Sequence, residues 1–286
     1  MKLDLNFKTN DYIYDVVEKN NVTFLQYPLL SQTGMVEHGI STREGGVSEG
    51  IYRSMNLSFG RGDDPEKVME NFRRMADALN VSVDNMVMTR QTHTTNVKVV
   101  DASDCGKGIT KERDYDDIDG LITNVPGICL VSLYADCVPL IFFDPVKKVV
   151  ATSHSGWRGT VNRMGEATIL EMQKEFGCDP ADILAAIGPS ICQDCYEVSE
   201  DVIDMFRQAF KEEQYDSLFY AKPNNKYQLN LWKANEIILR ESGILPEHLS
   251  VNNLCTCCNS EHMFSHRASK GKRGNLAAFI ALKEDL

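Results

Sequence analysis

The middle of the chain holds a cysteine and a histidine whose types and spacing suit a transition metal. Cys137 and His154 flank residues 138–153, where two β-rich runs surround an Asp-Pro turn signal, the pattern of an antiparallel hairpin. If residues 145–146 form a two-residue loop, Cys137 lies directly opposite His154, and their Cβ atoms are roughly 5 Å apart. Zinc binds a cysteine sulfur at about 2.3 Å and a histidine nitrogen at about 2.0–2.1 Å. The predicted pairing is therefore compatible with a metal ion shared by the two side chains.

A third ligand candidate is His93, in the segment RQTHTTNV at the end of an apparent strand. The three residues lie far apart in the chain, unlike the close pairs of zinc fingers, so the fold would have to assemble the site. Three cysteine and histidine ligands without a fourth describe an open catalytic site, where water or a substrate atom completes the tetrahedron. The alternative is that each residue is structural, a core cysteine and two hydrogen-bonding histidines.

The elements that position these residues form an α+β or mixed α/β pattern. Strands are predicted at 35–41, 86–91, 96–101, 128–136, 138–143, 148–153, 183–187 and 275–282. Helices are predicted at 64–79, 161–176, 200–212 and 232–242, from apolar periodicity and from cap residues such as Ser199, Gly177 and Gly243. Strands dominate the middle of the chain and helices follow later, so the pattern is not a regular βαβ alternation.

The composition indicates an ordinary globular protein. The chain has 286 residues, 43% of them hydrophobic and 25% charged, and we expect a single domain over residues 1–286. The segments 102–118 and 221–226 read as polar surface loops. A net charge of −11 argues against nucleic-acid or anionic-membrane binding, although a local arginine pocket could still hold an anionic substrate. The sequence starts without an apolar run of signal-peptide length, and nine cysteines, an odd count, do not suggest a disulfide framework. We therefore expect a cytoplasmic protein.

Two segments offer candidate anion-binding groups. Arg43, Gly45 and Gly46 follow a strand in REGG, where glycine lets backbone N–H groups approach an oxyanion and arginine supplies a forked donor. Arg158 precedes a predicted helix, and helix N-termini bind anions. The structural alternatives are a plain glycine turn and an arginine packed over Trp157.

Four further residues have candidate supporting roles. Asp136 either points away from the site by strand alternation or hydrogen-bonds a ligand histidine. Arg267 and His266 lie in a basic segment that forms either part of the substrate pocket or a solvated surface. Asn56 could orient a substrate hydroxyl or close a turn.

Ordered motifs along nearly the whole chain give it a resemblance to a known family. The strings are HGISTREGGVS (38–48), QTH (91–93), DGLIT (119–123), ADCVPLIFFDP (135–145), HSGWRGT (154–160), AIGPSIC (186–192) with CYEV (195–198), and SHRASKGKRGN (265–275). The chain resembles the YfiH-like family, also called laccase-domain or polyphenol-oxidoreductase proteins, which have purine nucleoside phosphorylase activity. The resemblance implies a layered α-β-β-α fold with mixed sheets. It also implies that His93, Cys137 and His154 bind one catalytic zinc ion.

The resemblance also implies the reaction. It predicts phosphorolysis of adenosine, inosine and S-methyl-5′-thioadenosine, and deamination of adenosine, so that the partners are purine nucleosides and phosphate, with no obligate protein partner. A zinc site could activate water for attack on the purine, although the glutamate of an HxE motif that usually shuttles protons in zinc deaminases is absent. Copper could enter the site by its higher intrinsic affinity. The histidine supply argues against a true multicopper oxidase, because only six histidines are present and none form HxH.

Two other functions use the same residues. In a thiol- or zinc-dependent amide hydrolase, acting for example on a cell-wall precursor, Cys137 would be the nucleophile and His154 the base. In a non-enzymatic interaction protein, zinc would have four protein ligands and no open position.

The remaining cysteines allow a second metal site. Cys192 and Cys195 form a CxxC, and CTCC at 255–258 holds three more thiols. Together they could form a structural zinc site or a redox pair. Adjacent and alternate cysteines are poor clamps for a tetrahedral ion, and we find no second CxxC, so the sequence favours plain buried thiols.

Overall fold

Two six-stranded sheets form the centre of the computed structural model, which describes residues 3–285. The first sheet has the order β1-β2-β3-β15-β7-β4, and the second has the order β14-β10-β8-β9-β6-β5. The first comprises β1 (Asp15–Lys19), β2 (Val22–Gln26), β3 (Val36–Ser41), β4 (Met86–Met88), β7 (Cys129–Tyr134) and β15 (Leu276–Leu282). The second comprises β5 (Val97–Val99), β6 (Gly120–Thr123), β8 (Val138–Asp144), β9 (Val149–Ser155), β10 (Leu184–Ile187) and β14 (Leu249–Ser250).

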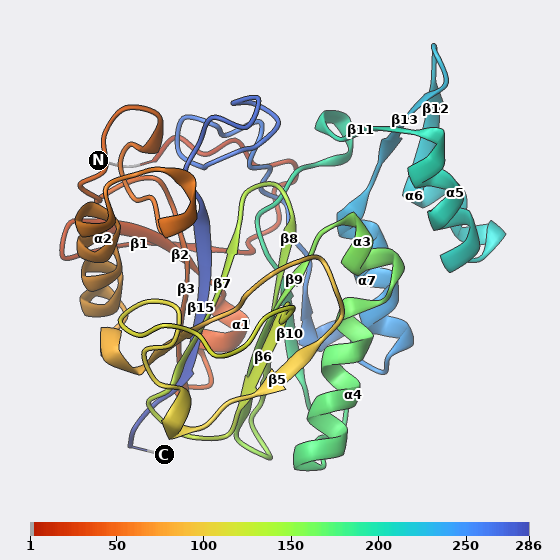
Figure 1. Cartoon of the computed structure of the whole chain (residues 1–286). Coiled ribbons are helices and arrows are strands. Elements are labelled where there is room, and N and C mark those ends of the chain that lie inside the picture. The colour runs from red at the N-terminus through yellow and green to blue at the C-terminus, as the bar shows by residue number, and fades with distance from the viewer. Residues whose placement is uncertain (1–2, 286) are drawn as a thin grey trace.

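Helices cover the outer face of each sheet, as Figure 1 shows. Helix α2 (Pro65–Ala78) lies against the first sheet, and α3 (Trp157–Val161), α4 (Met164–Phe176) and α7 (Leu231–Glu241) lie against the second. Both sheets are mixed, because β4 runs parallel to β7 in the first, and β5 runs parallel to β6 and β14 parallel to β10 in the second, whereas the other pairings are antiparallel. The expected α-β-β-α layered fold with mixed sheets is confirmed.

Strand alternation explains why the layers stack. On β7, Leu130 belongs to the core between the two sheets, whereas its neighbour Val131 packs under α2. On β8, Ile141 faces the first sheet and Phe142 faces the helices. Successive side chains of a strand point to opposite faces, so a strand covered on both sides needs an apolar run without alternation. This is the pattern that the sequence shows at 128–134 and 138–143.

A smaller unit projects from the helical side of the second sheet (Figure 1, upper right). It contains β11 (Glu197–Ser199), β12 (Phe219–Lys222) and β13 (Lys226–Leu229), in the order β11-β13-β12, with α5 (Glu200–Ala209) and α6 (Tyr215–Leu218). Helix α1 (Pro28–Ser31) connects β2 to β3. The segment 221–226, predicted as a loop, is the tip of the β12-β13 hairpin, and Asn224 and Asn225 provide its left-handed turn.

The predicted helices occur, with one break. Asp64 accepts a hydrogen bond from Glu66 N and caps α2, which follows the predicted range closely. The helix predicted at 161–176 is divided into α3 and α4, because Arg163 adopts a left-handed conformation with φ of +60°. Gly177 ends α4 in the left-handed conformation that its lack of a side chain allows. No helix within residues 3–285 is long and apolar enough to cross a membrane.

The β8-β9 hairpin forms, but not in the predicted register. Val138 pairs with Ser155 and Asp144 with Val149, so the loop has four residues rather than two. The Asp144 carboxylate accepts hydrogen bonds from two backbone N–H groups of that loop, and Lys148 closes it with φ of +53°. Because the register shifts by two residues, His154 stays on the predicted face, although its direct partner is Pro139 and not Cys137.

Candidate functional site

Three chain segments bring the predicted metal ligands together. Cys137 lies just before β8, His154 lies near the end of β9, and His93 lies in the loop between β4 and β5. One ligand atom from each of these side chains lies within 4.8 Å of the others. The two imidazole rings meet edge to face with their centroids 5.0 Å apart. His154 is buried, Cys137 is half-buried and His93 is exposed, so the group opens to solvent on the His93 side.

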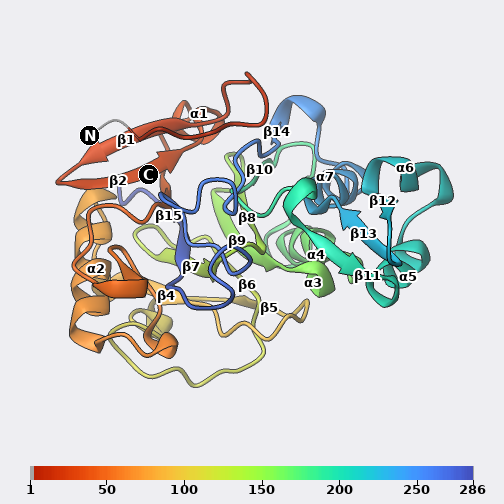
Figure 2. The same cartoon turned by 90° about the horizontal axis from the view of Figure 1, so that it is seen from above.

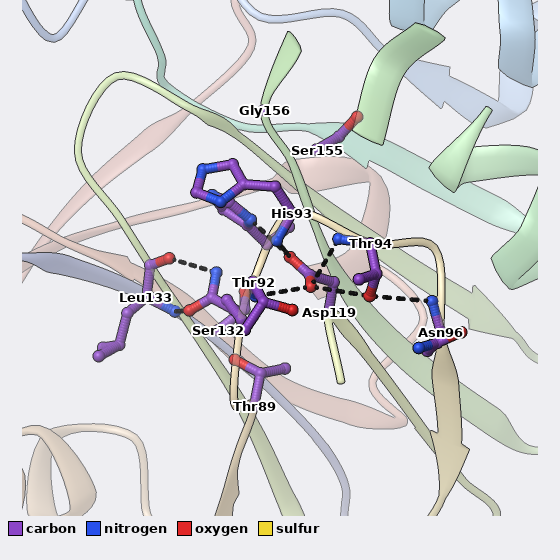
Figure 3. A network of polar contacts seen from close by, with 12 residues as sticks. Thr89, Thr92, His93, Thr94, Asn96, Asp119, Ser132, Leu133, Ser155 and Gly156 are labelled. Atoms are coloured by element: carbon purple, nitrogen blue, oxygen red, sulfur yellow. Dashed lines mark hydrogen bonds and ion pairs between the residues drawn. The ribbon is translucent and has the colours of Figure 1, made fainter. Parts of the chain in front are cut away.

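Asp119 holds two of these ligands in place. Its carboxylate accepts hydrogen bonds from the backbone N–H groups of Thr92 (2.9 Å), His93 (3.2 Å) and Thr94 (3.0 Å), as the close view in Figure 3 shows. These bonds stabilise the turn in which His93 adopts φ of +69°, a conformation uncommon for a residue with a side chain. The turn directs the His93 ring toward the site.

The same carboxylate orients His154. The Nδ1 of His154 lies 2.9 Å from Oδ1 of Asp119. Burial would raise the pKa of Asp119, but the hydrogen bonds from His154 and the turn lower it below its ordinary value. An ionised carboxylate only accepts hydrogen bonds, so Nδ1 carries the proton and the lone pair of Nε2 is left for a metal. This carboxylate–histidine arrangement is typical of metal sites.

Cys137 and His154 influence each other's ionisation strongly. Burial opposes ionisation of the Cys137 thiol, but the charge of His154 and hydrogen bonds from both histidines lower its pKa to about 6. Burial also disfavours the charged form of His154, but the Cys137 thiolate and Asp119 raise its pKa to about 9. Near neutral pH, and without a metal, the pair is therefore a thiolate and an imidazolium.

Gly156 leaves the room that the ligands need. A Cβ atom on this residue would lie 3.0 Å from the Cys137 sulfur and 3.0 Å from a carbon of the His93 ring. Such contacts are closer than side chains normally tolerate. The glycine that follows His154 by two positions is therefore a steric requirement of the site.

Asp136 does not support a ligand histidine, the second of the two roles considered for it. Its carboxylate accepts hydrogen bonds from Thr256 Oγ1 (2.7 Å) and from the backbone N–H of Arg267 (2.6 Å). Its backbone has φ of +83° and its carbonyl accepts from Ile191 N. Asp136, the residue before Cys137, is thus bonded to the 255–275 segment. The carboxylate partner of the ligand His154 is Asp119.

A cavity of about 350 Å³ opens beside the ligand group, and His93 and Cys137 belong to its lining. Its lining combines ligands, apolar and aromatic side chains, and basic groups: Arg61, His93, Ala135, Asp136, Cys137, Trp157, Ile191, Tyr196, Leu231, His266, Arg267 and Arg273. Much of the basic wall comes from the segment between β14 and β15, which Figure 2 shows in blue, crossing the ends of the sheets. The cavity size and mixed lining are those of a small-molecule site.

The basic wall is suited to an anion. Arg273 is buried, and burial together with the neighbouring Arg61 charge lowers its pKa to about 10. Its Nε is buried and has no hydrogen-bond partner within the described part of the chain. Burial and the Arg273 charge also lower the pKa of His266. Clustered cations with an unused donor create a positive potential that an anionic ligand would relieve.

Of the residues considered for substrate binding, only Arg267 and His266, both in the basic segment, line the cavity. The guanidinium of Arg267 lies 5.5 Å from the Tyr196 ring centroid and donates to Glu197 O at 2.9 Å. Arg158 is exposed and packs over Trp157, with its guanidinium carbon 4.3 Å from the ring centroid. This matches the structural alternative considered for Arg158, although Trp157 and Tyr196, both beside it, belong to the cavity wall.

The REGG segment lies outside the cavity. Arg43 donates to the backbone carbonyls of Arg53 (2.8 Å) and Ser260 (2.6 Å), so much of its donor capacity is used within the protein. It lines a separate cavity of about 220 Å³, which shares Arg273 with the first. Gly45 and Gly46 are packed against backbone, where a Cβ atom would meet other atoms at 2.3 Å and 2.1 Å. Close chain packing, rather than oxyanion approach, explains these two glycines.

Asn56 is fully buried and closes a turn, the second of its two predicted roles. Its side-chain oxygen accepts from Ser58 N (3.1 Å) and Asn275 N (2.9 Å), and its amide donates to Asp63 (2.9 Å). It thereby fixes the end of the basic segment that contains Arg273.

Sequence reasoning missed Asp119, Arg61, Arg273, Trp157 and Tyr196 as site residues. Asp119 could have been found from the DG that begins DGLIT, because metal-bound histidines usually have a carboxylate partner. Arg273 lies in the basic segment already considered for Arg267. Nothing in the local sequence around Arg61 distinguishes it from a surface arginine.

Comparison with known proteins agrees with this geometry. The family described as multi-copper polyphenol oxidoreductase laccase matches residues 37–283. The chain belongs to this family. It is 37% identical over 250 residues to purine nucleoside phosphorylase YlmD of Bacillus subtilis, covering 86% of this chain and 88% of that protein. It is also 35% identical over 229 residues to adenosine deaminase RL5 from an unknown prokaryotic organism, covering 79% and 87%.

A solved structure shares the fold. YlmD from Geobacillus stearothermophilus superposes with a TM-score of 0.86 and 32% identity, over 94% of this chain and 99% of that one. The copper in the family's description has little support in the residues. Within residues 3–285, only His93 and His154 among the histidines join a potential metal-binding group, whereas laccase chemistry needs several histidine-rich copper centres.

Proposed function

We propose that this protein is a zinc-dependent purine nucleoside enzyme acting as a single catalytic domain. The proposed reactions are phosphorolysis of adenosine, inosine and S-methyl-5′-thioadenosine, and deamination of adenosine. The observation that carries the proposal is an open three-ligand group, of which His93 and Cys137 line a cavity that also has a basic wall. Relatives named purine nucleoside phosphorylase and adenosine deaminase support the same substrate class.

The donor set fits zinc. One thiolate and two imidazoles, gathered within 4.8 Å, are a common ligand combination for catalytic zinc, and Asp119 provides the outer partner that such a histidine requires. When bound, zinc would supply Lewis acidity toward a water molecule or a substrate atom. Copper is a competing occupant by affinity, so the metal must be established by analysis.

Different walls of the cavity suit the two substrates of phosphorolysis, the nucleoside and phosphate. Trp157 and Tyr196, with Ile191 and Leu231, offer aromatic and apolar surface for a planar purine ring. Arg61, Arg267 and Arg273 offer forked donors for phosphate. Holding a phosphate ion and a nucleoside side by side is the positioning that phosphorolysis requires.

Product analysis with defined metal content tests the proposal. Zinc-loaded protein is incubated with adenosine, inosine or S-methyl-5′-thioadenosine, with and without phosphate, and the purines are separated by chromatography. From adenosine we expect adenine only when phosphate is present, inosine without phosphate, and inosine together with hypoxanthine from its phosphorolysis when phosphate is present. The chelated protein should form neither, and zinc should restore both. If metal-verified protein forms no purine product from any of the three nucleosides, the proposed function is wrong.

A thiol-dependent amide hydrolase is the second candidate, and one observation favours it. The pKa of Cys137 is lowered to about 6 beside His154, as in a cysteine nucleophile with its base. A thiol enzyme would work without zinc and lose activity on alkylation. Rapid iodoacetamide modification of Cys137 in fully zinc-loaded protein, with parallel loss of activity, would favour this candidate over the first. The third alternative, a non-enzymatic closed zinc site, needs a fourth ligand that this group lacks among the described residues.

A further inference from the structure

Four cysteines outside the cavity form a second cluster. Cys192 and Cys195 lie at a short 3-10 turn (Gln193–Cys195), and Cys255 and Cys258 lie in the segment after β14. Their sulfur atoms all lie within 4.8 Å of one another, and all four thiols are free. Cys258 is exposed and Cys195 is half-buried, so the prediction of plain buried thiols is wrong for these two.

These four residues form two CxxC motifs. The CTCC segment contains Cys255-x-x-Cys258, so the expectation that the sequence holds no second CxxC is wrong. Cys257 is the member that stays outside the cluster. Two CxxC pairs brought together from distant parts of a chain are the usual ligand set of a structural zinc site.

The distances between sulfur atoms suit one tetrahedral ion. Zinc–sulfur bonds of about 2.3 Å place the sulfur atoms of a tetrahedron about 3.8 Å apart. Here Cys195 Sγ lies 3.6 Å from Cys258 Sγ, and Cys192 Sγ lies 4.0 Å from the same atom. Disulfide-bonded sulfurs lie at about 2.0 Å, so none of the thiols is paired covalently.

Backbone N–H groups and a lysine ammonium lie close to the sulfur atoms of the cluster. The backbone N–H groups of Cys192 (3.2 Å) and Cys258 (3.4 Å) both donate to the sulfur of Cys255. The ammonium group of Lys8, which is bonded to Asp194 at 3.2 Å, also acts electrostatically on Cys192 and Cys258. Backbone donors and a nearby cation offset the negative charge that four thiolates leave on a divalent ion.

We propose that Cys192, Cys195, Cys255 and Cys258 bind a second zinc ion with a structural role. Four protein ligands leave no open position, which distinguishes this site from the catalytic group. The proposal is independent of the substrate, because it concerns residues that do not line the cavity.

The cluster is placed to stabilise the cavity wall. Tyr196, which lines the cavity, directly follows Cys195. Thr256, next to Cys255, donates from its backbone to Ser190 O (3.1 Å) and from its hydroxyl to Asp136 (2.7 Å), the residue before Cys137. A zinc ion joining the 192–195 and 255–258 segments would therefore hold together two chain segments whose neighbours Ile191 and Thr256 both hydrogen-bond Asp136, the residue before Cys137.

Zinc stoichiometry tests the site. Protein purified under reducing conditions without chelator should contain about two zinc ions per chain by elemental analysis. The Cys195→Ser/Cys258→Ser variant should retain about one, and so should His93→Ala/His154→Ala. The matched control is Cys257→Ser, which changes a cysteine of the same segment outside the cluster and should retain two. One zinc in the wild type, unchanged by Cys195→Ser/Cys258→Ser, would overturn the proposal.

X-ray absorption at the zinc edge keeps the test decisive if the cysteine variant fails to fold. In His93→Ala/His154→Ala protein, only the four-cysteine site can hold zinc with a full ligand set. We expect an all-sulfur shell of four ligands at about 2.3 Å. A shell with nitrogen or oxygen ligands, or no bound zinc, would refute the assignment. A disulfide within the cluster, found by mass spectrometry of unreduced protein, would indicate a redox pair instead and would also refute it.

Discussion

Replacing Asp119 gives the sharpest test of how the proposed catalytic group, His93, Cys137 and His154, is held in place. In Asp119→Asn, the side chain keeps its size and one oxygen acceptor but loses its charge. It can no longer accept from His154 Nδ1 (2.9 Å) and from the N–H groups of the 92–94 turn as a full carboxylate does. The substitution therefore weakens the support of both histidine ligands at once.

The magnitude follows from these contacts. A hydrogen bond to a charged group contributes about 1.5–3 kcal/mol, and loss of a metal ligand's outer partner typically costs 10–100-fold in metal affinity. Each tenfold loss corresponds to about 1.4 kcal/mol. We expect zinc affinity at the His93–Cys137–His154 group to fall by about 10- to 100-fold.

Competition with a chromophoric chelator measures this affinity. The four-cysteine site is removed from the comparison by working in the Cys195→Ser/Cys258→Ser background or by resolving two phases in the titration. Asp116→Ala is the matched control, because Asp116 lies in the same loop but forms only an exposed ion pair with Arg90. Circular dichroism checks that each protein is folded. An affinity within twofold of the parent in folded Asp119→Asn protein would refute the orienting role of this carboxylate.

Three further predictions concern single residues. Gly156→Ala should remove zinc from the catalytic group while the fold persists, since its Cβ would lie 3.0 Å from the Cys137 sulfur; elemental analysis measures the loss. Arg61→Gln should raise the phosphate KM about tenfold or more, because an exposed cation beside buried Arg273 would lose its charge-assisted bonds to phosphate. In zinc-free protein, Cys137 should react with iodoacetamide at half its maximal rate near pH 6, because the thiolate is the nucleophile and its fraction rises with pH through the pKa.

Controls for these three come from the same regions. Gly159→Ala, where the nearest atom to a Cβ is 3.4 Å away, should retain zinc. Arg158→Ala, which loses only the stacking on Trp157, should change the phosphate KM much less than Arg61→Gln. Cys105, whose thiol pKa is raised by burial, provides the internal reference for alkylation. Zinc retention in Gly156→Ala, an unchanged KM in Arg61→Gln, or a Cys137 alkylation midpoint as high as that of Cys105 would contradict the respective argument.

The sequence by itself determined the main strands and helices and the identity of the three candidate ligands, whereas the layered α-β-β-α arrangement was implied by the family resemblance of its ordered motifs. Apolar runs at 128–134 and 138–143 indicated strands, and Gly177 marked a helix end, because these signals act over a few neighbouring residues. The chemistry of cysteine and histidine limited the metal candidates to few positions. Even an error of two residues in the β8-β9 register left His154 on the correct face, since side chains alternate with a period of two.

Only the tertiary structure decided which other residues join the site. Asp119 forms hydrogen bonds with His93 and His154, which both lie far from it in the sequence. Arg61 acts electrostatically on Arg273, although the two residues are also far apart in the sequence. Such contacts depend on how sheets and loops pack, which local patterns do not record. The same packing occupies Arg43 with backbone carbonyls and brings two distant CxxC pairs to one point, so that the four-cysteine cluster is a property of the fold rather than of any one segment.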